Sequence, residues 1–402
     1  MNRMNVVVAL EHRFNSAPDG SIWTKTMFGY SYWQRYLNVF DGVRIVARVR
    51  CVDLIPEDWI RVNDEGVTFA PVPYYVGPWQ YLSRAHRVRR AAKASIGESD
   101  AVLLYLSGQI GSCIDPIMRR EGRPYGVYVI ADPYDVFGPG SVRHPLRPIF
   151  RWLFPRRLRR QCGCASAVAY ITEAALQRRY PPGPAAFSTS FPMGEMPPQA
   201  YMSAPRSRSS VSREFTLIIV GAMSQMYKAQ DVLIDAVAAC VDDGLDLRLI
   251  LVGDGRHRPE LEARADARGL GRRVCFKGEL TFGASVRDEL DKGDLFVLPS
   301  RQEGLPRAMI EAMARGLPCI GSTVGGIPEL LPDEDMVPPG DAIALSSKIR
   351  EVLSNPDRMY KMSDRNLKRA RAFSDVLVGE RRDRFYRRLR ETTETWLENR
   401  LR

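Results

Sequence analysis

The chain has 402 residues, of which 45% are hydrophobic and 26% charged, and its formal net charge at pH 7 is +11. This composition is typical of a folded protein and excludes a disordered polyelectrolyte, a collagen and a disulfide-rich mini-protein. At about 100–200 residues per domain, the length predicts two domains, and no apolar run approaches the roughly 18–20 residues that span a bilayer. Seven cysteines without paired zinc-ligand spacing favour a reducing compartment and a cytoplasmic protein.

The first half of the chain begins with the apolar run NVVVAL (5–10). Glu11, His12 and Arg13 follow at once, so the run is too short for a signal-peptide core and predicts a first β-strand. Helical segments lie between several of the later apolar runs, which predicts an α/β domain over residues 1–195. The further strands expected in this domain cover 43–49, 101–106, 126–132 and 167–172.

The positive charge is concentrated in this half. Residues 1–200 carry 25 Lys and Arg against 16 Asp and Glu, whereas residues 201–402 carry 33 against 31. No acidic residue occurs from Val136 to Thr172, where arginines alternate with Trp, Phe and Leu. Such a helix suits an anionic membrane surface. The alternatives are contact with nucleic acid and a solvated helix whose apolar side packs inward. The residues that we expect to contact a membrane are Arg151, Trp152, Arg156, Arg157 and Arg160.

The second half begins after a Pro-, Ser- and Arg-rich segment, 191–215, which is the best candidate for a linker. Regular alternation of buried strands and helices follows, and it predicts a parallel sheet with helices on both faces. We expect a domain over 196–375 and a last, charged helix over 376–402 that crosses back to the first domain. The predicted strands cover 216–221, 247–253, 274–278, 294–300 and 317–322.

The most informative segment is PSRQEGLPRAMIEAMARGLP (299–318), which runs from a strand end through a loop into a helix. Glu303 lies in the loop, and Glu311 lies about 8 Å along the helix at 1.5 Å per residue. Two carboxylates at this spacing could reach a sugar and a ribose, with a diphosphate between them at the positive helix end. Two surface glutamates that flank a buried helix would show the same spacing.

The surrounding sequence resembles the Glu-x7-Glu region of retaining, nucleotide-sugar-dependent glycosyltransferases of family four. Three further segments follow that family's order: 218–237 with its Gly-ended strand and Lys, 249–270 with a Gly-Asp-Gly turn, and 274–280. The resemblance covers about residues 216–350 well and is much weaker over 1–190. It implies the GT-B architecture, in which two Rossmann-like α/β domains with parallel sheets face a central cleft. It also implies hexosyl-type transfer from a nucleotide-diphosphate sugar as co-substrate, with no further cofactor.

The resemblance assigns roles to individual residues. Lys228 should contact the donor diphosphate, Glu311 should bind the ribose hydroxyls, and Glu303 should face the transferred sugar as a catalytic residue. The turn residues that should lie against the donor are Gly304, Leu305, Pro306, Gly221 and, in the first domain, Gly20. For Gly20, an ordinary polar turn is the alternative.

Two positions depart from the family pattern. The Arg that many members carry soon after the strand-ending glycine is absent after Gly221. That phosphate contact is therefore either missing or supplied by Arg301 or an arginine of the first domain. The acceptor-side His is also absent, and Asp132 at the end of the 126–132 segment is the candidate to orient or deprotonate an acceptor hydroxyl. The alternatives are that Asp132 caps a turn before Pro133 or that His144 takes the role.

Partners and alternatives follow from these features. The triplet from Asp333 to Asp335 sits in a loop after a proline, so we interpret it as a turn and expect no metal requirement. The acceptor that we expect is a lipid-linked saccharide in cell-surface polysaccharide or glycolipid synthesis, reached by a cytoplasmic enzyme that is free or peripheral on the inner membrane face. The alternatives are a transferase for small-molecule or sugar-phosphate acceptors and a non-catalytic GT-B scaffold. We expect no nucleic-acid partner, because no such motif is present.

Overall fold

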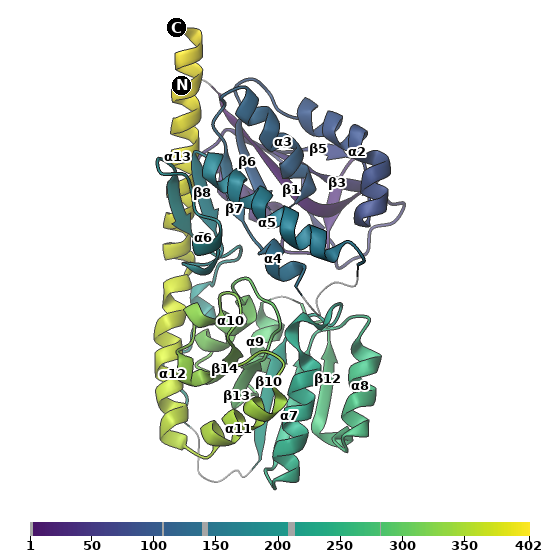
Figure 1. Cartoon of the computed structure of the whole chain (residues 1–402), viewed down its shortest axis with the longest axis vertical. Helices are drawn as coiled ribbons and strands as arrows, with labels where there is room; N and C mark the ends of the chain where they lie inside the picture. The colour runs from purple at the N-terminus through teal and green to yellow at the C-terminus, as the bar shows by residue number, and fades with distance from the viewer. Residues whose placement is uncertain (1–2, 107, 139–143, 208–213, 282) are drawn as a thin grey trace. The chain divides into compact units, whose positions relative to one another are not determined.

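The computed structural model describes residues 3–106, 108–138, 144–207, 214–281 and 283–402 (Figure 1). The chain divides into two compact units, and each unit is interrupted in sequence. The first unit comprises Met1–Pro133, Trp152–Met193 and Gly379–Arg402, and the second comprises Tyr134–Arg151 and Gly194–Val378. The expected boundaries at 195 and 375 lie near two of these divisions, while the assignment of 134–151 to the second unit has no counterpart in the sequence analysis.

A nine-stranded sheet forms the centre of the first unit. Its parallel part has the order β5-β3-β1-β6-β7-β8-β9, and the short β2 and β4 add antiparallel pairs beside the end of β1. The chain therefore builds β3 and β5 on one side of β1 and then returns to build β6 to β9 on the other. The strands are β1 Asn5–Ser16, β2 Ile22–Thr24, β3 Gly42–Cys51, β4 Ile60–Arg61, β5 Val67–Val72, β6 Ala101–Leu106, β7 Gly126–Val129, β8 Ala167–Tyr170 and β9 Phe187–Ser190.

All five strands predicted for this unit are present, and four others were missed. The missed strands β2 and β4 are only two or three residues long, and β9 (FSTS) carries no continuous apolar run. Helices cover both faces of the sheet (Figure 1). Leu104 faces Gly111 of α3, whereas the neighbouring Leu103 lies beside Leu389 of α13, and successive strand residues point to opposite faces. The helices of this unit are α1 Tyr30–Leu37, α2 Gly77–Ala94, α3 Gln109–Arg120, most of α5 Arg147–Cys164, α6 Ala175–Arg179 and most of α13 Asp375–Leu401. The short α4 Pro133–Val136 belongs, apart from its first residue, to the second unit.

The long α13 begins in the second unit and ends in the first. Within the first unit, Phe385, Tyr386 and Leu389 are buried, and the Tyr386 ring stacks on Tyr36 of α1 with 4.4 Å between ring centres. These aromatic contacts bury an apolar stripe of a helix whose remaining surface is charged. The last helix is thus part of the core of the first unit.

The second unit is built on a six-stranded, fully parallel sheet with the order β12-β11-β10-β13-β14-β15. Each of the five strands predicted from the buried apolar runs is present, which confirms the α/β fold class with parallel sheets. Its strands are β10 Phe215–Val220, β11 Leu247–Val252, β12 Val274–Gly278, β13 Leu295–Leu298, β14 Cys319–Ser322 and β15 Met336–Val337. Its helices are α7 Gln230–Asp242, α8 Arg258–Ala267, α9 Ala284–Leu290, α10 Arg307–Ala314, α11 Ala342–Leu353 and α12 Pro356–Ala370.

The predicted linker is partly packed against the units. Phe191 and Met196 are buried, and Arg206 donates to the backbone oxygens of Gly293 at 2.8 Å and Arg315 at 2.6 Å. Residues 208–213 of this segment lie outside the described residues. The lack of periodicity in this segment thus corresponds to irregular backbone, and specific contacts nevertheless hold its described residues in place.

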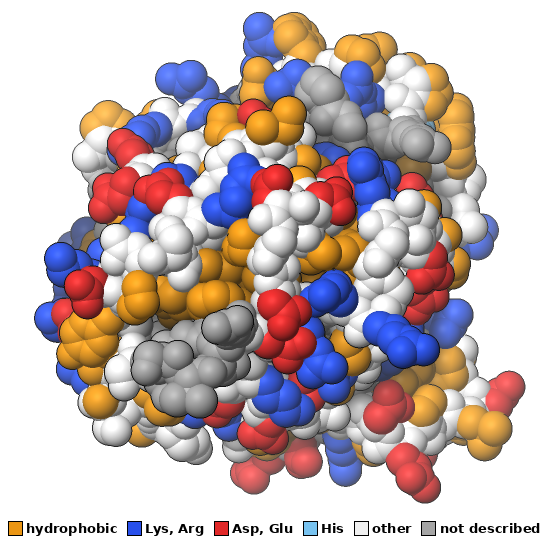
Figure 2. All heavy atoms as spheres, turned by 90° about the horizontal axis from the view of Figure 1, so that it is seen from below, with side chains coloured by type: hydrophobic (Ala, Val, Ile, Leu, Met, Phe, Trp, Pro, Cys, Tyr) orange, Lys and Arg blue, Asp and Glu red, His pale blue; other side chains and the backbone are white. Residues whose placement is uncertain are grey.

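Two surface properties bear on possible partners. Within the described part of the chain, no helix is both long enough and apolar enough to cross a membrane. Figure 2 shows one face of the molecule, on which Lys and Arg side chains lie among Asp and Glu side chains rather than in a single basic field.

Candidate active site

The strand order of the second unit places a switch point between β10 and β13. From β10 the chain builds β11 and β12 on one side, and it then crosses over to build β13, β14 and β15 on the other. The loops that leave β10 and β13 therefore diverge, and the crevice between them is where parallel α/β sheets bind ligands. These two loops carry most of the residues singled out in the sequence.

Lys228 and Glu303 meet at this crevice. The Lys228 ammonium lies 2.6 Å from Glu303 Oε1, and the Ser300 hydroxyl donates to the same oxygen at 2.7 Å. Ser300 is itself held by the Ser322 hydroxyl, which donates to its backbone oxygen at 2.6 Å. Lys228 was predicted to contact the diphosphate and Glu303 to face the sugar. The two side chains come from separate loops and contact each other.

The loop that carries Lys228 is shaped by backbone constraints. A Cβ on Gly221 would lie 2.8 Å from Lys228 Cγ, so the missing side chain lets the lysine stem cross the end of β10. The following residue, Ala229, has a φ of 53°, in the left-handed region that L-residues rarely adopt. This turn starts α7 directly after the lysine and fixes the direction in which its side chain leaves the loop.

Arg301 holds this loop from the side of β13. Its guanidinium forms a two-pronged ion pair with Asp231 at 2.8 and 2.7 Å, and its backbone N–H donates to the Tyr227 oxygen at 2.7 Å. The same guanidinium donates to the Met226 oxygen at 3.1 Å, so one side chain fastens both ends of the 226–231 turn. Burial alone raises the pKa of Asp231, but hydrogen bonding and charge from Arg301 outweigh burial and hold that pKa below its ordinary value. Arg301, a candidate for the missing phosphate contact, is therefore engaged in supporting the lysine loop.

Glu311 lies on α10 and is only 7% exposed. Its Oε1 accepts a hydrogen bond from Arg307 Nε at 3.0 Å, one helical turn earlier. Burial raises the pKa of Glu311, and the Arg307 charge opposes that rise. Arg307 was not predicted as a site residue, although its i, i+4 spacing from Glu311 is visible in the sequence. The pair forms a buried, polar wall on the first two turns of α10.

The turn between Glu303 and α10 rests on the loop that follows β14. Gly325 has a φ of 55°, and a Cβ there would lie 2.1 Å from the Glu303 backbone oxygen. The Gly326 N–H donates to the Gly304 oxygen at 2.6 Å. Leu305 packs against the core of the second unit, and Pro306 is the N-cap of α10. The structure thus gathers the predicted donor residues of the second unit around the ends of β10 and β13.

Two predicted residues lie in the first unit. Asp132 follows β7 and is 8% exposed, and its two carboxylate oxygens accept hydrogen bonds from Arg179 and from the Tyr180 hydroxyl. These partners fix the orientation of the carboxylate. Gly20 has a φ of 82° in the turn between β1 and β2, where the Asp19 carboxylate accepts from the Ser21 N–H. This is the geometry of a polar hairpin turn.

The residues predicted for membrane contact lie on α5. Trp152 is 59% exposed, and the Arg156 guanidinium lies 4.0 Å from its ring centre. Arg151 stacks on the Tyr134 ring at 3.9 Å, and Arg160 is exposed. Arg157 instead turns inward and donates to Gln109 of α3 at 3.2 Å, and burial lowers its pKa. Residues 139–143 of the acid-free run lie outside the described residues.

The first unit contains a carboxylate at its own switch point that the sequence analysis did not single out. Glu11 lies within β1, just past Ala9, the last residue of β1 that pairs with β6. Its Oε2 accepts from the backbone N–H groups of Gln109 at 2.9 Å and Ile110 at 3.1 Å, at the start of α3. Its other oxygen accepts from the Tyr75 hydroxyl. A Cβ on Gly108 would lie 2.7 Å from the Glu11 Cβ, so only glycine admits this approach. An acidic residue directly after the first apolar run, 5–10, was the available signal.

His12, the next residue, is a second missed polar group. Its Nε2 lies 3.2 Å from the hydroxyls of Thr24 and Thr26, and its ring contacts Phe14 edge-on with 4.6 Å between ring centres. Burial, together with the charges of Arg48 and Arg13, lowers the pKa of His12 to about 4. The imidazole is therefore neutral at pH 7.

The acidic triplet is the segment that most resembles a metal-binding pattern. It forms a single 3-10 turn over Asp333–Asp335, and the buried Asp335 carboxylate pairs with Arg358 and Arg365. Asp335 is therefore engaged in ion pairs within the second unit. Across the described ranges, no group of three or more His, Cys, Asp or Glu side chains is placed to hold a metal ion.

Comparison with known proteins places this geometry in a family. Residues 214–355 match the family described as glycosyl transferases group 1. Protein CapJ of Staphylococcus aureus is 26% identical over 334 residues, 82% of each chain, and the alpha-D-kanosaminyltransferase of Streptomyces kanamyceticus is 26% identical over 76% of this chain and 83% of its own. A GDP-mannose-dependent monoacylated alpha-(1-6)-phosphatidylinositol monomannoside mannosyltransferase of Corynebacterium glutamicum is 33% identical over 38% of this chain and 42% of its own.

Solved structures show the same fold. Sucrose-phosphate synthase from Thermosynechococcus elongatus aligns with a TM-score of 0.69 and 18% identity, over 96% of this chain and 99% of that one. HepE from Anabaena, solved in complex with UDP and glucose, aligns with a TM-score of 0.62 and 17% identity, over 94% and 98%. The two parallel sheets thus define the GT-B fold. Within that fold, residues 214–355 match the group 1 glycosyl transferases, and CapJ and the kanosaminyltransferase align over most of the chain, in agreement with the resemblance.

Proposed function

We propose that this protein is a retaining glycosyltransferase that moves a sugar from a nucleotide-diphosphate donor to an acceptor hydroxyl without a metal ion. The observation that carries the proposal is the contact of Lys228 with Glu303 at the switch point, beside the buried Glu311. One cation and two carboxylates there match the three charged groups that a nucleotide sugar requires: a partner for the diphosphate, one for the sugar and one for the ribose.

Donor binding would exchange partners at Lys228. A diphosphate is a doubly charged competitor for the ammonium that Glu303 now holds at 2.6 Å. Once Lys228 turns to the phosphate, the Glu303 carboxylate is released toward the sugar, while Ser300 still donates to it. The related HepE structure is a complex with UDP and glucose, which supports a donor of this class.

The chemistry that follows needs no nucleophile from the chain. The bond between the anomeric carbon and the phosphate oxygen breaks, and positive charge develops on the sugar. Glu303 is placed to stabilise that charge, and Lys228 stabilises the negative charge on the leaving diphosphate. The acceptor oxygen forms the new bond on the same face, and its proton passes to the leaving phosphate, so the anomeric configuration is retained. Asp132 is proposed to orient the acceptor, since its own oxygens are fixed by Arg179 and Tyr180.

The acceptor that we propose is a lipid-linked saccharide at a membrane surface. The relative from Corynebacterium glutamicum is named for a phosphatidylinositol-based acceptor, and α5 exposes Trp152 among arginines. The kanosaminyltransferase relative supports the second candidate, a transferase for a small-molecule acceptor.

A thermal-shift screen of nucleotide sugars should identify the donor, because ligand binding to the folded state raises the unfolding temperature. Turnover of that donor is then compared for the wild type, Glu303→Ala and the exposed control Glu334→Ala. The proposal expects loss of turnover only in Glu303→Ala, retention in the product by NMR, and no effect of EDTA. Equal background rates in all three proteins would instead identify a non-catalytic scaffold.

A further inference from the structure

Helix α2 of the first unit is a second basic segment without acidic residues. No Asp or Glu occurs between Glu65 and Glu98. The helix occupies residues 77–94 of that stretch and has no acidic residue in its first turn. Its charged side chains are all basic: Arg84, Arg87, Arg89, Arg90 and Lys93.

The exposed side of α2 combines an apolar end with a basic continuation. Trp79 and Leu82 are 70% and 63% exposed, although such large apolar side chains are usually buried. His86 and Arg90 continue the same stripe at helical spacing, and both are exposed. The opposite side carries the fully buried Val88, which packs the helix onto the first unit.

Helix α2 packs against α3 of the first unit (Figure 1). Tyr81 of α2 is close enough to act on the pKa of Arg157 of α5, and the Tyr81 hydroxyl lies 3.5 Å from the Cys113 sulfur of α3. The residue before α2, Val76, is 47% exposed. The apolar end of α2 therefore continues into the preceding loop.

We propose that the outer stripe of α2 docks the first unit on an anionic lipid bilayer, with Trp79 and Leu82 inserted at headgroup depth and Arg87 and Arg90 on lipid phosphates. The proposal rests on the proposed function in one respect, that a lipid-linked acceptor requires the enzyme at a membrane. A helix with exposed Trp and Leu at one end and only basic charges along its length has the composition that binds such surfaces. Leu82 and Val76 favour a bilayer over nucleic acid, because aliphatic side chains gain from hydrocarbon but cannot stack on bases.

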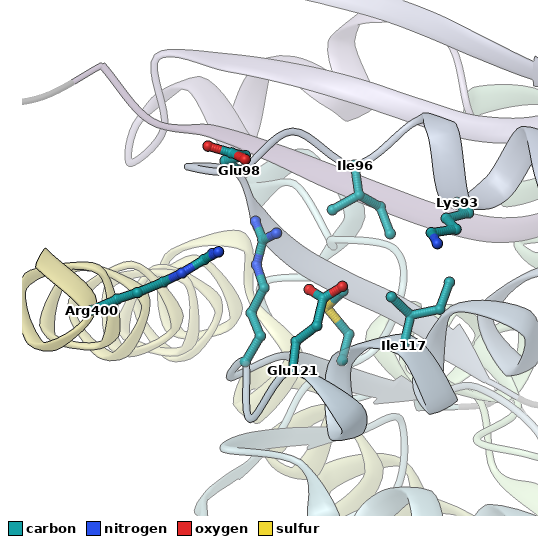
Figure 3. Close-up of a pocket in the computed structure, with 8 residues that line it drawn as sticks. Lys93, Ile96, Glu98, Ile117, Glu121 and Arg400 are labelled. Carbon is teal, nitrogen blue, oxygen red and sulfur yellow. The ribbon is translucent and has the colours of Figure 1, made fainter.

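The outer stripe of α2 ends near the C-terminal end of the helix, where acidic and basic side chains occur together. A cavity of about 370 Å³ lies at the C-terminal end of α2, and Figure 3 shows Lys93, Glu98 and Glu121 around it, with Arg400 reaching in from α13. The two glutamates offset the cations there, so this region lacks the single-sign charge of the helix. The docking surface is therefore assigned to residues 76–90.

The test is sedimentation of the full chain with vesicles of phosphatidylcholine, alone or mixed with phosphatidylglycerol. The first variant is Arg87→Gln with Arg90→Gln, and its control is Arg384→Gln with Arg387→Gln, which removes the same charge from exposed positions of α13. At about 1 kcal/mol per basic residue near an anionic surface, the α2 pair should lower partitioning about 30-fold, while the control changes it far less. The second variant, Trp79→Ala with Leu82→Ser, should lower it about tenfold or more, in contrast to Ile343→Ser on α11, where the side chain is 80% exposed.

The outcomes separate docking from catalysis. The α2 variants should keep the donor turnover of the wild type in solution, and Glu303→Ala should keep vesicle binding. Equal binding of the α2 variants and their controls would overturn the proposal, as would equal binding to neutral vesicles. Binding to single-stranded nucleic acid, with none to the anionic vesicles, would assign the stripe to a different partner and overturn it as well.

Discussion

The two units have sheets of the same kind, and each has a switch point, but the two switch points are filled differently. In the first unit, Glu11 occupies the start of α3 and accepts hydrogen bonds from the N–H groups of Gln109 and Ile110. In the second unit, the crevice between β10 and β13 holds Lys228 and Glu303 as an ion pair. The positive end of a helix attracts an anion in either case. The first unit supplies that anion from its own chain, whereas the second unit supplies a cation.

This difference supports the proposal that the second unit binds the donor. A helix N-terminus that is already capped by a carboxylate has its N–H groups satisfied, and a phosphate could bind there only by displacing Glu11. At the switch point of the second unit, the Lys228 ammonium can form an ion pair with a phosphate. Four substitutions test this contrast, from the largest expected effect to the smallest.

Lys228→Ala should lower donor turnover by roughly 100- to 1,000-fold, as does the loss of one preorganised group that stabilises developing charge. Lys228→Arg should restore part of the rate, because it keeps the charge. The exposed Lys292→Ala, measured by the same assay, serves as the control. Wild-type turnover in Lys228→Ala would contradict a role of Lys228 in donor binding and with it the proposed difference between the two switch points.

Glu11→Ala should lower the free energy of unfolding of the first unit by about 3 kcal/mol, since it removes the side-chain acceptor of two N–H groups and the Tyr75 hydroxyl, and the ion-pair partner of Arg48. Thermal and denaturant unfolding measure this loss, with the exposed Glu98→Ala as the control. If inorganic phosphate fully restored stability to Glu11→Ala, the first switch point would itself be an anion site, and the contrast would have to be redrawn.

The acid sensitivity of the first unit should depend on His12. Its pKa is lowered to about 4 in the folded state, from an ordinary value of 6.5, so protonation favours the unfolded chain. The stabilising contribution is complete above pH 6.5 and is lost as the pH falls toward 4, by about 2 kcal/mol at pH 5. His12→Gln should remove this part of the pH dependence, which unfolding curves between pH 7 and about pH 5 would show. Unchanged slopes would mean that the imidazole titrates normally.

Asp231→Asn should lower donor turnover about tenfold and leave KM nearly unchanged, because a charge-assisted pair worth about 1.5 kcal/mol no longer holds the 226–231 turn that carries Lys228. Asp235→Asn, one turn later on α7, is the matched control, since Asp235 pairs with Arg264 and Arg268 instead. Equal losses of turnover in both variants would assign the effect to α7 as a whole rather than to the lysine turn.

The local pattern of the sequence determined much of the second unit. Its strands are continuous apolar runs that end in Gly or polar residues, and strands buried on both faces must have that composition. The motif order placed Lys228, Glu303 and Glu311 correctly on two loops and a helix, because each lies within a few residues of a strand or helix end. Loop spacing alone did not reveal that Lys228 and Glu303 contact each other, since 75 residues separate them in the chain.

The tertiary structure decided what long-range contacts control. Strand order made Glu11 the cap of α3, nearly 100 residues away, and it made Arg301 a support for the lysine loop. Packing likewise decided that Trp79 is exposed on a basic helix whereas Trp33 is fully buried. Composition and periodicity record which residues can be buried or charged, but only the packing of distant segments determines which partner each charge meets and which apolar side chains stay on the surface.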